Sequence, residues 1–373
     1  MTRALVLCEF GSLNGGERSL LAALDGVLAA GFEVCVAAPG QGALAAELQQ
    51  RNVPLAPFDV RTGDSAAQLA TRRSLLAELL RGQRPDLVHA NSLAMSRLSG
   101  PVARELQLAS IGHLRDIMRV TPAAARDLSH HRRLLAVSHA VRNWYREQGL
   151  PAERLHVAYN GVDVEQFRPR LPTGYLAAEL GLPRHTAFAL SVGQIILRKG
   201  LDVLLSAAEI VVSQGADVHF VIAGSRLSAK PETVAHEQDL LRRAAQPPLA
   251  GRVHLLGLRS DMERLLAEAT LLVHAARQEP LGRVLLEAAA AGVAVVATRV
   301  GGTTEIFPEA DQAAWIVPPD SPTDLAAAVR QALADGPLRA QTALRARRII
   351  EERFTAQQAA RNLADHYHAA LDR

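Results

Sequence analysis

Short apolar runs alternate with amphipathic segments along the whole chain, and this rhythm is the feature that most constrains the fold. The runs are rich in Val, Leu, Ile and Ala, as are strands of a parallel sheet that is buried on both faces. The segments between them have the length and apolar spacing of helices, so each run and its neighbour suit a βαβ unit. The sequence therefore predicts an α/β protein with doubly wound parallel sheets.

The rhythm occurs twice, with a break between the two series. Strands of the first series are predicted at residues 4–8, 33–38, 53–58, 86–90, 109–114, 134–138 and 155–159. Strands of the second series are predicted at residues 188–193, 218–224, 252–257, 270–276, 293–298 and 314–319. The segment 160–174 is rich in Pro and Gly and is typical of a domain boundary. We therefore predict domains at 1–168 and 169–354, with the last two helices over 338–372.

Length and composition agree with two domains. A chain of 373 residues is too long for one core of ordinary size. Hydrophobic residues make up 49% of the chain and charged residues 21%, which is ordinary for a globular protein. The formal charge of +3 is small and no long block of like charge occurs, so we expect no nucleic-acid partner.

The cysteines and the N-terminus indicate a compartment. Cys8 and Cys35 each lie in a short apolar run, so reduced core thiols are expected rather than a disulfide or a metal site. The apolar run before Glu9 is too short for a signal peptide, and no uncharged stretch is long enough to span a membrane. We therefore expect a cytoplasmic protein.

Two glutamates, Glu279 and Glu287, frame the segment that is most informative about function. Glu287 lies within VLLEAAAA, and a helix that is apolar on all sides is a buried helix. A buried carboxylate costs several kcal/mol unless another group bonds it. A predicted strand and the pair Gly301 and Gly302 follow, which places these residues near the carboxyl edge of a sheet, where ligands bind. The alternative is a salt-bridged glutamate of the core.

Two further segments suit the binding of anions. Gly15 and Gly16 follow the first predicted strand, but the spacing G-x-x-x-G-G differs from the dinucleotide fingerprint, so the pair is either a binding loop or a simple connection. The segment VGQIILRKG at 192–200 follows a strand and opens a helix. It holds one of only two lysines, Lys199 and Lys230, in a chain with 39 arginines. An ammonium kept in such a chain indicates a position where a guanidinium would not fit, although chance placement also explains it.

The carboxylate pair lies in the stretch LLVHAARQEPLGRVLLEAAAAGVAVVATRVGG, which resembles the E-x7-E element of retaining glycosyltransferases with the GT-B fold, especially family 4 (glycosyl transferases group 1). Residues 134–169 resemble the segment of that family from a serine-headed helix to an NGVD turn. The resemblance covers nearly the whole chain and implies two Rossmann-like domains facing a cleft. It implies an acceptor-binding domain at 1–168, a nucleotide-sugar-binding domain at 169–354 and a last helix at 355–373 that crosses back to the first domain.

The resemblance also implies how the donor is held. Glu279 would bind hydroxyls of the donor sugar, and Glu287 would bind the ribose, which would satisfy its buried carboxylate. Family members usually carry Phe where this chain has Leu281. The donor-binding residues implied are Gly15, Gly16, Gly193, Gln194, Gly224, Leu281, Gly282, Arg283 and Glu287.

The clamp for the diphosphate departs from the family pattern. The family supplies an arginine where this chain has Gln194 and a lysine that Lys199 matches, so Arg198 is the expected substitute for the arginine. A functional histidine of the family is matched by His113. Catalytic roles are thus implied for His113, Arg198, Lys199 and Glu279, and acceptor-side roles for Arg115 and Asp116. No D-x-D motif occurs, so we expect no metal and no cofactor, with cations and helix ends stabilising the diphosphate.

A basic region of the first domain has two interpretations. A cluster of His130, His131, Arg132 and Arg133 shares this region with Arg115, Arg119, Arg126, Arg142 and Arg146. It is either a solvated helix end or a surface for peripheral contact with an anionic membrane, at the inner face of the cell membrane.

The function implied is metal-independent, retaining transfer of a hexose from a nucleotide-diphosphate sugar to a hydroxyl of a carbohydrate, lipid-linked or small-molecule acceptor. Three alternatives stay open: a nucleotide-sugar epimerase of related fold, a phosphorylase-like enzyme with a pyridoxal-bearing lysine, and a catalytically silent nucleotide-binding protein. The sequence leaves the base, the sugar, the acceptor and the oligomeric state undecided.

Overall fold

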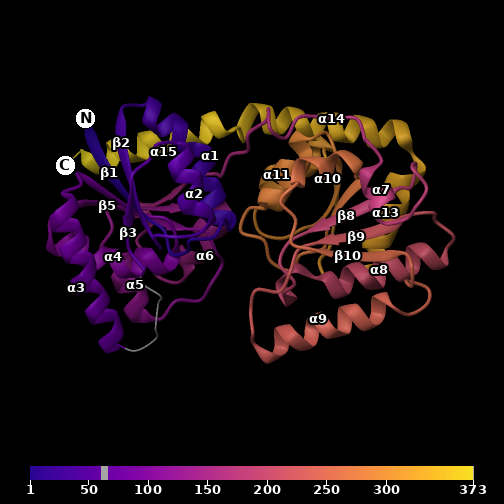
Figure 1. Ribbon diagram of the computed structural model, residues 1–373, viewed down its shortest axis with the longest axis horizontal. Coiled ribbons are helices and arrows are strands. Elements are labelled where there is room, and N and C mark those ends of the chain that lie inside the picture. The colour runs from indigo at the N-terminus through magenta and orange to yellow at the C-terminus, as the bar shows by residue number, and fades with distance from the viewer. Residues whose placement is uncertain (60–65, 373) are drawn as a thin grey trace. The chain divides into compact units, whose positions relative to one another are not determined.

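The structure is a computed structural model that describes residues 1–59 and 66–372. The chain forms two compact units, one made of Met1–Gly161 with Ala356–Arg373 and the other of Val162–Thr355 (Figure 1). Each unit is a parallel sheet covered by helices. The predicted α/β class with two doubly wound sheets is confirmed.

Among the described residues, the first unit is built on a seven-stranded parallel sheet with the order β3-β2-β1-β4-β5-β6-β7. The strands are β1 (Thr2–Leu7), β2 (Phe32–Ala38), β3 (Leu55–Pro57), β4 (Leu87–Ala90), β5 (Ala109–Leu114), β6 (Arg133–Ala136) and β7 (Leu155–Val157). Each strand overlaps a predicted run. The order reverses between β1 and β4, and ligands of such sheets bind beyond the carboxyl ends of the strands at this switch point.

The helices of the first unit cover both faces of its sheet. They are α1 (Gly15–Ala29), α2 (Ala43–Gln50), α3 (Ala66–Gln83), α4 (Leu93–Glu105), α5 (Pro122–Leu128), α6 (His139–Glu147) and α15 (Ala356–Leu371), with a 3-10 turn at Ala152–Arg154. Helices α1 and α15 lie side by side on one face, where Gly26 lets them approach closely, since a Cβ there would lie 2.4 Å from the Cβ of Ala360 (Figure 1). Their apolar side chains share one core with Val6 and Ile111.

The second unit contains a six-stranded parallel sheet within residues 162–355, all of which are described, with the order β10-β9-β8-β11-β12-β13. The strands are β8 (Phe188–Val192), β9 (His219–Ala223), β10 (Val253–Gly257), β11 (Leu271–His274), β12 (Ala294–Thr298) and β13 (Trp315–Val317). Every residue of β12 is buried, which explains its uninterrupted apolar sequence. The switch point of this sheet lies between β8 and β11.

The helices of the second unit precede, connect and follow these strands. They are α7 (Tyr175–Glu179), α8 (Leu201–Ser213), α9 (Pro231–Ala244), α10 (Met262–Glu268), α11 (Arg283–Ala290), α12 (Thr303–Ile306), α13 (Pro322–Ala334) and α14 (Gly336–Arg353), with 3-10 turns at Leu197–Lys199 and Glu309–Asp311. Helices α14 and α15 confirm the two helices that were predicted over 338–372. No helix in the described part of the chain is long and apolar enough to cross a membrane.

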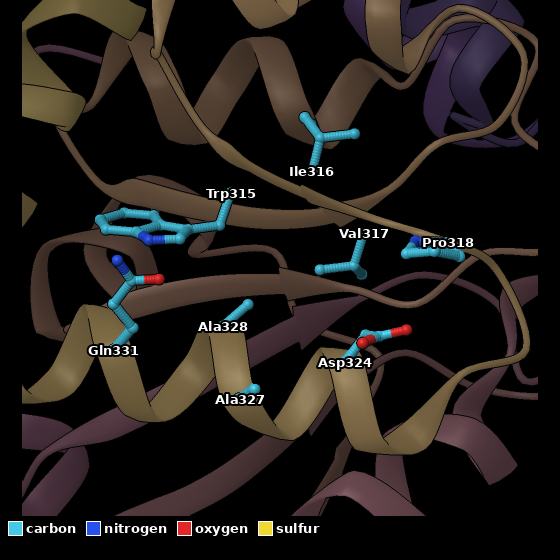
Figure 2. A pocket seen from close by; sticks show the side chains of 8 residues that line it. All are labelled: Trp315, Ile316, Val317, Pro318, Asp324, Ala327, Ala328 and Gln331. Carbon is cyan, nitrogen blue, oxygen red and sulfur yellow. The ribbon is translucent and has the colours of Figure 1, made fainter.

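A shallow pocket lies on the edge strand of the second sheet. It is lined by Trp315, Ile316, Val317, Pro318, Asp324, Ala327, Ala328 and Gln331 (Figure 2). These residues belong to β13, the segment after it and α13, and they include none of the predicted site residues. The pocket is therefore separate in the sequence from the candidate site described next.

Candidate functional site

The backbone of Glu279 is fixed by the glycine pair that follows β12. The N–H of Gly302 donates to the carbonyl oxygen of Glu279 at 3.1 Å. Gly301 has a φ of +49°, and a Cβ on it would lie only 1.8 Å from the same oxygen. The two loops can touch because both positions lack a side chain. This glycine pair therefore serves to position the loop that carries Glu279.

The side chain of Glu279 lies in a buried polar cluster. It is 6% exposed, and its Oε2 forms an ion pair with the ammonium of Lys199. The same oxygen lies 2.8 Å from Nε2 of His274, which is 3% exposed and ends β11. Burial of a carboxylate is tolerated when other groups bond it, and two groups do so here.

The charge states in this cluster follow from burial and the nearby cation. Burial alone would raise the pKa of Glu279, but Lys199 and the hydrogen bond from His274 hold it well below its usual range. Burial lowers the pKa of His274 despite its contact with Glu279, so the imidazole is neutral and its Nε2–H donates to the carboxylate. Glu279 is thus a charged acceptor at neutral pH.

A second cation lies beside this cluster. The charge of Arg198 helps to lower the pKa of His274, and its Nη1 is buried without a hydrogen-bond partner among residues 1–59 and 66–372. Its backbone oxygen accepts the N–H of Arg277 at 2.8 Å, which ties this turn to the loop of Glu279. Two cations, Lys199 and Arg198, thus lie near His274, and only Lys199 is paired with Glu279, so the cluster suits an anionic ligand.

Arg277 holds these two loops together, and the sequence did not reveal this role. Its guanidinium donates to both carboxylate oxygens of Asp202, at 2.8 and 2.6 Å, and to Asp320 at 2.6 Å. It also donates to the carbonyl oxygen of Leu197 at 2.9 Å. A bidentate guanidinium fixes geometry as well as charge. The turn that carries Lys199 is therefore locked to the segment before Glu279.

Glu287 lies on α11 and is 8% exposed, as its apolar surroundings predicted. Its Oε1 lies 2.9 Å from Nε of Arg283, one turn earlier, in an ion pair rather than a directed hydrogen bond. The structure thus contains the salt bridge that the alternative interpretation of Glu287 requires. Ribose binding by Glu287 stays a prediction.

The other donor-side residues of this unit adjoin the same cluster. A Cβ on Gly193 would lie 3.4 Å from Cε of Lys199, and one on Gly224 would lie 1.8 Å from the oxygen of Gly193. Gln194 follows Gly193 in this loop and is partly buried. Leu281 is buried, and Gly282 caps α11 at its N-terminus with a φ of +106°.

The site residues predicted in the first unit meet around Arg115. Its guanidinium donates to Oδ1 of Asn91 and of Asn160, both at 2.7 Å, and to the carbonyl oxygen of Asn91 at 3.0 Å. Gly16, in the first turn of α1, packs against it, since a Cβ there would lie 3.2 Å from Cδ of Arg115. The Cβ position of Gly15 is open. The Nε, Nη1 and Nη2 atoms of Arg115 thus all donate hydrogen bonds to protein groups.

His113 is the last residue but one of β5, lies close to Arg115 and is 4% exposed. Its Nδ1 lies 3.2 Å from both Nη2 of Arg115 and Nε2 of His89. The carboxylate-bearing residue Asp116 is exposed, and its backbone oxygen accepts the hydroxyl of Tyr145 at 3.0 Å. The sequence signal for His89 was available, because it interrupts an apolar strand that is buried throughout.

The predicted basic cluster of the first unit is not one surface. His131 is fully buried, with its ring nitrogens 3.1 Å from Oγ of Ser110 and 2.8 Å from the oxygen of Ser96. Both interpretations of this cluster were wrong for His131, because it is a core residue. The guanidinium of Arg115 forms hydrogen bonds within the protein. Exposed arginines of the region are Arg119, Arg126, Arg132 and Arg146.

The cysteines agree with the predicted thiols in part. Both are free, and burial raises the pKa of the Cys8 thiol. Cys35, on β2, is only half-buried and packs against the core that contains Leu76 and Leu98.

Comparison with known proteins assigns the family. The sequence profile described as Glycosyl transferases group 1 matches residues 176–349, and the profile described as Glycosyltransferase Family 4 matches residues 13–166. The chain belongs to glycosyltransferase family 4. The fold expected from this resemblance, GT-B, is confirmed by similar solved structures.

Among curated relatives of this family 4 protein, the alpha-maltose-1-phosphate synthase of Mycobacterium tuberculosis (strain CDC 1551 / Oshkosh) is 34% identical over 182 residues, which are 46% of this chain and 45% of the relative. The phosphatidyl-myo-inositol mannosyltransferase of Mycolicibacterium smegmatis is 30% identical over 277 residues, 72% of this chain and 65% of the relative. The match thus spans about half the length of the first relative.

Solved structures match over nearly the whole chain. The Anabaena Alr3699/HepE structure in complex with UDP and glucose has a TM-score of 0.87 at 22% identity, covering 99% of this chain and 100% of that chain. WaaG, described as a glycosyltransferase involved in lipopolysaccharide biosynthesis, has a TM-score of 0.72 at 20% identity, covering 98% and 99%. At such identities the likeness establishes the shared fold.

Proposed function

We propose that this family 4 protein is a retaining, metal-independent glycosyltransferase that moves a sugar from a nucleotide-diphosphate sugar to an acceptor hydroxyl. The observation that carries the proposal is the buried cluster of Glu279, Lys199 and His274, with Arg198 beside it. It combines a charged acceptor suited to sugar hydroxyls with cations suited to a diphosphate. In this proposal the second unit binds the donor and the first unit binds the acceptor.

Each donor contact has a physical reason in this proposal. Glu279 accepts hydrogen bonds from hydroxyls of the sugar, and these bonds are strong because the carboxylate stays charged. Glu287 accepts the ribose hydroxyls from within α11. The first N–H groups of this helix lack intrahelical partners and lie directly after Glu279 and Leu281, where an anion is favoured.

Catalysis consists mainly of charge stabilisation. Negative charge grows on the diphosphate as the glycosidic bond breaks, and Lys199 and Arg198 are already positioned by the Arg277 clamp. Donors that are fixed before the reaction need no reorganisation during it, and the loss of one typically costs about 10²–10³-fold in kcat. Binding of both substrates and exclusion of water supply the remaining effect.

The test begins with the donor. Thermal unfolding is measured with the diphosphates of uridine, guanosine and adenosine and with their sugars, because a ligand of the folded state raises its stability. The preferred nucleotide should lose its stabilising effect in Lys199→Met and Glu287→Ala. If no nucleotide raises the melting temperature, or both variants respond like the wild type, the proposed donor site is wrong.

The second step measures transfer. Names of relatives include alpha-maltose-1-phosphate, D-inositol 3-phosphate and phosphatidyl-myo-inositol, so the acceptor panel starts with sugar phosphates, inositol phosphates and phosphoinositides. Proton NMR of the product gives the anomeric configuration, and an excess of EDTA tests the metal. Inversion of the anomeric configuration would contradict a retaining mechanism, and loss of turnover in EDTA would contradict metal independence. Conversion of the donor without any acceptor would indicate an epimerase instead.

We also propose cytoplasmic localisation and peripheral contact with anionic lipid through exposed arginines of the first unit. Arg146 lies on α6, and Arg119 follows Met118 on the loop beside this helix. The indole N–H of Trp144, also on α6, donates to the backbone oxygen of Met118 at 2.9 Å and so holds this loop to the helix. Sedimentation with phosphatidylglycerol vesicles, compared with phosphatidylcholine vesicles, tests this contact. The double variant Arg119→Glu and Arg146→Glu should bind less to the anionic vesicles than the wild type does. Equal binding by the variant and the wild type would refute the proposed contact.

A further inference from the structure

A chain of hydrogen bonds crosses the core of the first unit and ends at His113. Tyr367 of α15 has its hydroxyl 2.8 Å from Nδ1 of His89, and Nε2 of His89 lies 3.2 Å from Nδ1 of His113. All three side chains are at least 96% buried. Alternate residues of a strand point to the same face of the sheet, so His113 shares a face with Ile111 of β5. Ile111 packs in the core to which α15 contributes, so these side chains lie between the sheet and α15.

Arg115 determines which groups donate and which accept along this chain of hydrogen bonds. A guanidinium has only donors, so its 3.2 Å contact makes Nδ1 of His113 an acceptor. The neutral His113 ring then carries its proton on Nε2. His89 must donate from Nε2 to the same Nδ1, which leaves its own Nδ1 as an acceptor. The hydroxyl of Tyr367 must therefore donate to His89.

The two rings stay neutral. Burial, followed by the charge of Arg115, lowers the pKa of His89 to about 3 and lowers that of His113 well below its ordinary value. Burial also raises the pKa of Tyr367, so its hydroxyl keeps the proton that it donates. The directions worked out above thus hold through neutral pH.

His113 ends this chain with a donor that no protein group uses. Its Nε2 is buried and has no hydrogen-bond partner in the described parts of the chain. Buried N–H groups are nearly always bonded in folded proteins, so such an exception calls for an explanation. The carboxyl ends of β1, β4 and β5 lie together, and ligands of such sheets bind there.

The family resemblance already implies a site role for His113. We propose that Arg115, His89 and Tyr367 are positioning residues that set the tautomer of His113, so that its Nε2–H is the donor that remains for an oxygen of a sugar substrate. This inference rests on the proposed function and deepens it. In this tautomer Nε2 of His113 can donate a hydrogen bond but cannot accept a proton. It also gives α15, at the far end of the sequence, a part in the site of the first unit.

The first test needs no substrate. Nitrogen-15 NMR of histidine rings in the full chain distinguishes the two neutral tautomers from the imidazolium, with assignments from His89→Gln and His113→Gln. Both His89 and His113 should be Nε2–H tautomers from pH 6 to pH 8. Tyr367→Phe should shift the Nδ1 signal of His89, whereas Tyr175→Phe, which removes a hydroxyl bonded to Asp261 in the other unit, should not. A protonated Nδ1 on His113 overturns the proposal.

The second test uses turnover. A glutamine amide can replace Nε2–H as a donor, so His113→Gln should keep kcat within about tenfold of wild type, whereas His113→Leu should lose about 10²–10³-fold. Tyr367→Phe should lower kcat/KM with an unchanged melting temperature and an unchanged pH profile. If His113→Gln is as inactive as His113→Leu and removes a limb of the pH profile, His113 transfers protons and the proposal is wrong. If the predicted tautomers are found but no donor is turned over, the proposed function fails instead.

Discussion

Lys199→Met tests whether the ammonium keeps Glu279 charged inside the protein. Methionine keeps an apolar stem of similar length and removes the charge. The side chains of Lys199 and Glu279 are 13% and 8% exposed, so water cannot replace the lost partner well. Only the hydrogen bond from His274 remains to Glu279 among the contacts described above. A nearly buried carboxylate is then left without its counter-charge.

The expected loss is large for a single substitution. Breaking a buried ion pair by removing one partner costs about 3–5 kcal/mol, and the bond from His274 places this case near the lower end. In a unit of the size of Val162–Thr355, 1 kcal/mol corresponds to about 2–4 °C. The transition of this unit should therefore fall by roughly 6–12 °C at neutral pH.

The loss should also depend on pH in a defined direction. The pKa of Glu279 in the folded wild type lies below its ordinary value of 4.5, so its contribution to stability is present above that value and is lost as the pH falls through the folded pKa. Without Lys199, burial should raise the pKa of this carboxyl, and protonation should relieve the unpaired charge. The difference between wild type and Lys199→Met should thus shrink from pH 7.5 towards pH 4.5.

Scanning calorimetry at these two pH values measures the effect. Lys230→Met is the matched control, because Lys230 is the other lysine of the chain and is exposed at the start of α9. Glu279→Gln in the Lys199→Met background should restore much of the lost stability, since it removes the unpaired charge. Equal melting temperatures for Lys199→Met and Lys230→Met at pH 7.5 would refute the reasoning.

Three further predictions concern the donor site. Glu287→Ala should weaken binding of a nucleoside diphosphate alone, whereas Glu279→Ala should mainly weaken binding of the intact nucleotide sugar, each by about 1.5–3 kcal/mol in calorimetry; equal effects on both ligands would contradict the assignment. Gly301→Ala should lower donor affinity far more than Gly181→Ala, because both positions have positive φ but only the first Cβ would meet the Glu279 backbone; equal affinities would disprove the packing argument. Arg198→Ala should reduce kcat by about 10–1,000-fold with little change in melting temperature, and near-normal kcat would show that another cation stabilises the diphosphate.

The architecture was predictable from the sequence because its signals are local. A strand buried on both faces favours an apolar run, and the run at β12 is of this kind. Strand ends differ from the predictions by one or two residues because terminal residues lack the full set of ladder contacts. The buried setting of Glu287 was equally local, since it follows from the residues on either side of it.

The partners within the site were not predictable, because they join distant parts of the chain. Lys199 and Glu279 are 80 residues apart, and His89 and Tyr367 are 278 apart. No spacing rule links such pairs before the sheet order is known. The order places β8 beside β11, and it places β4 and β5 under α15. The roles of Arg277, His89 and Tyr367 therefore emerged only with the fold.

The error at His131 has the same origin. Four basic residues in a row suggest a solvated turn, but the turn before β6 directs His131 inward. Its ring fits because its Cδ2 would lie 3.3 Å from a Cβ on Gly100 and 2.9 Å from a Cβ on Gly112. Two glycines on separate elements thus leave space for an imidazole. The pattern of charges along the sequence does not show that these glycines lie next to His131.

The presence of a lysine at position 199, in a chain with only one other, has a local explanation. The stem of Lys199 packs beside Gly193, since a Cβ there would make van der Waals contact with Cε at 3.4 Å. Gly200, the next residue, is pressed against the oxygen of Ala275, since a Cβ there would lie 2.0 Å away. The backbone of this turn is therefore closely packed against the segment after β11. A planar guanidinium is larger than an ammonium and spreads its charge over a fork, so it would not place one compact charge on Glu279.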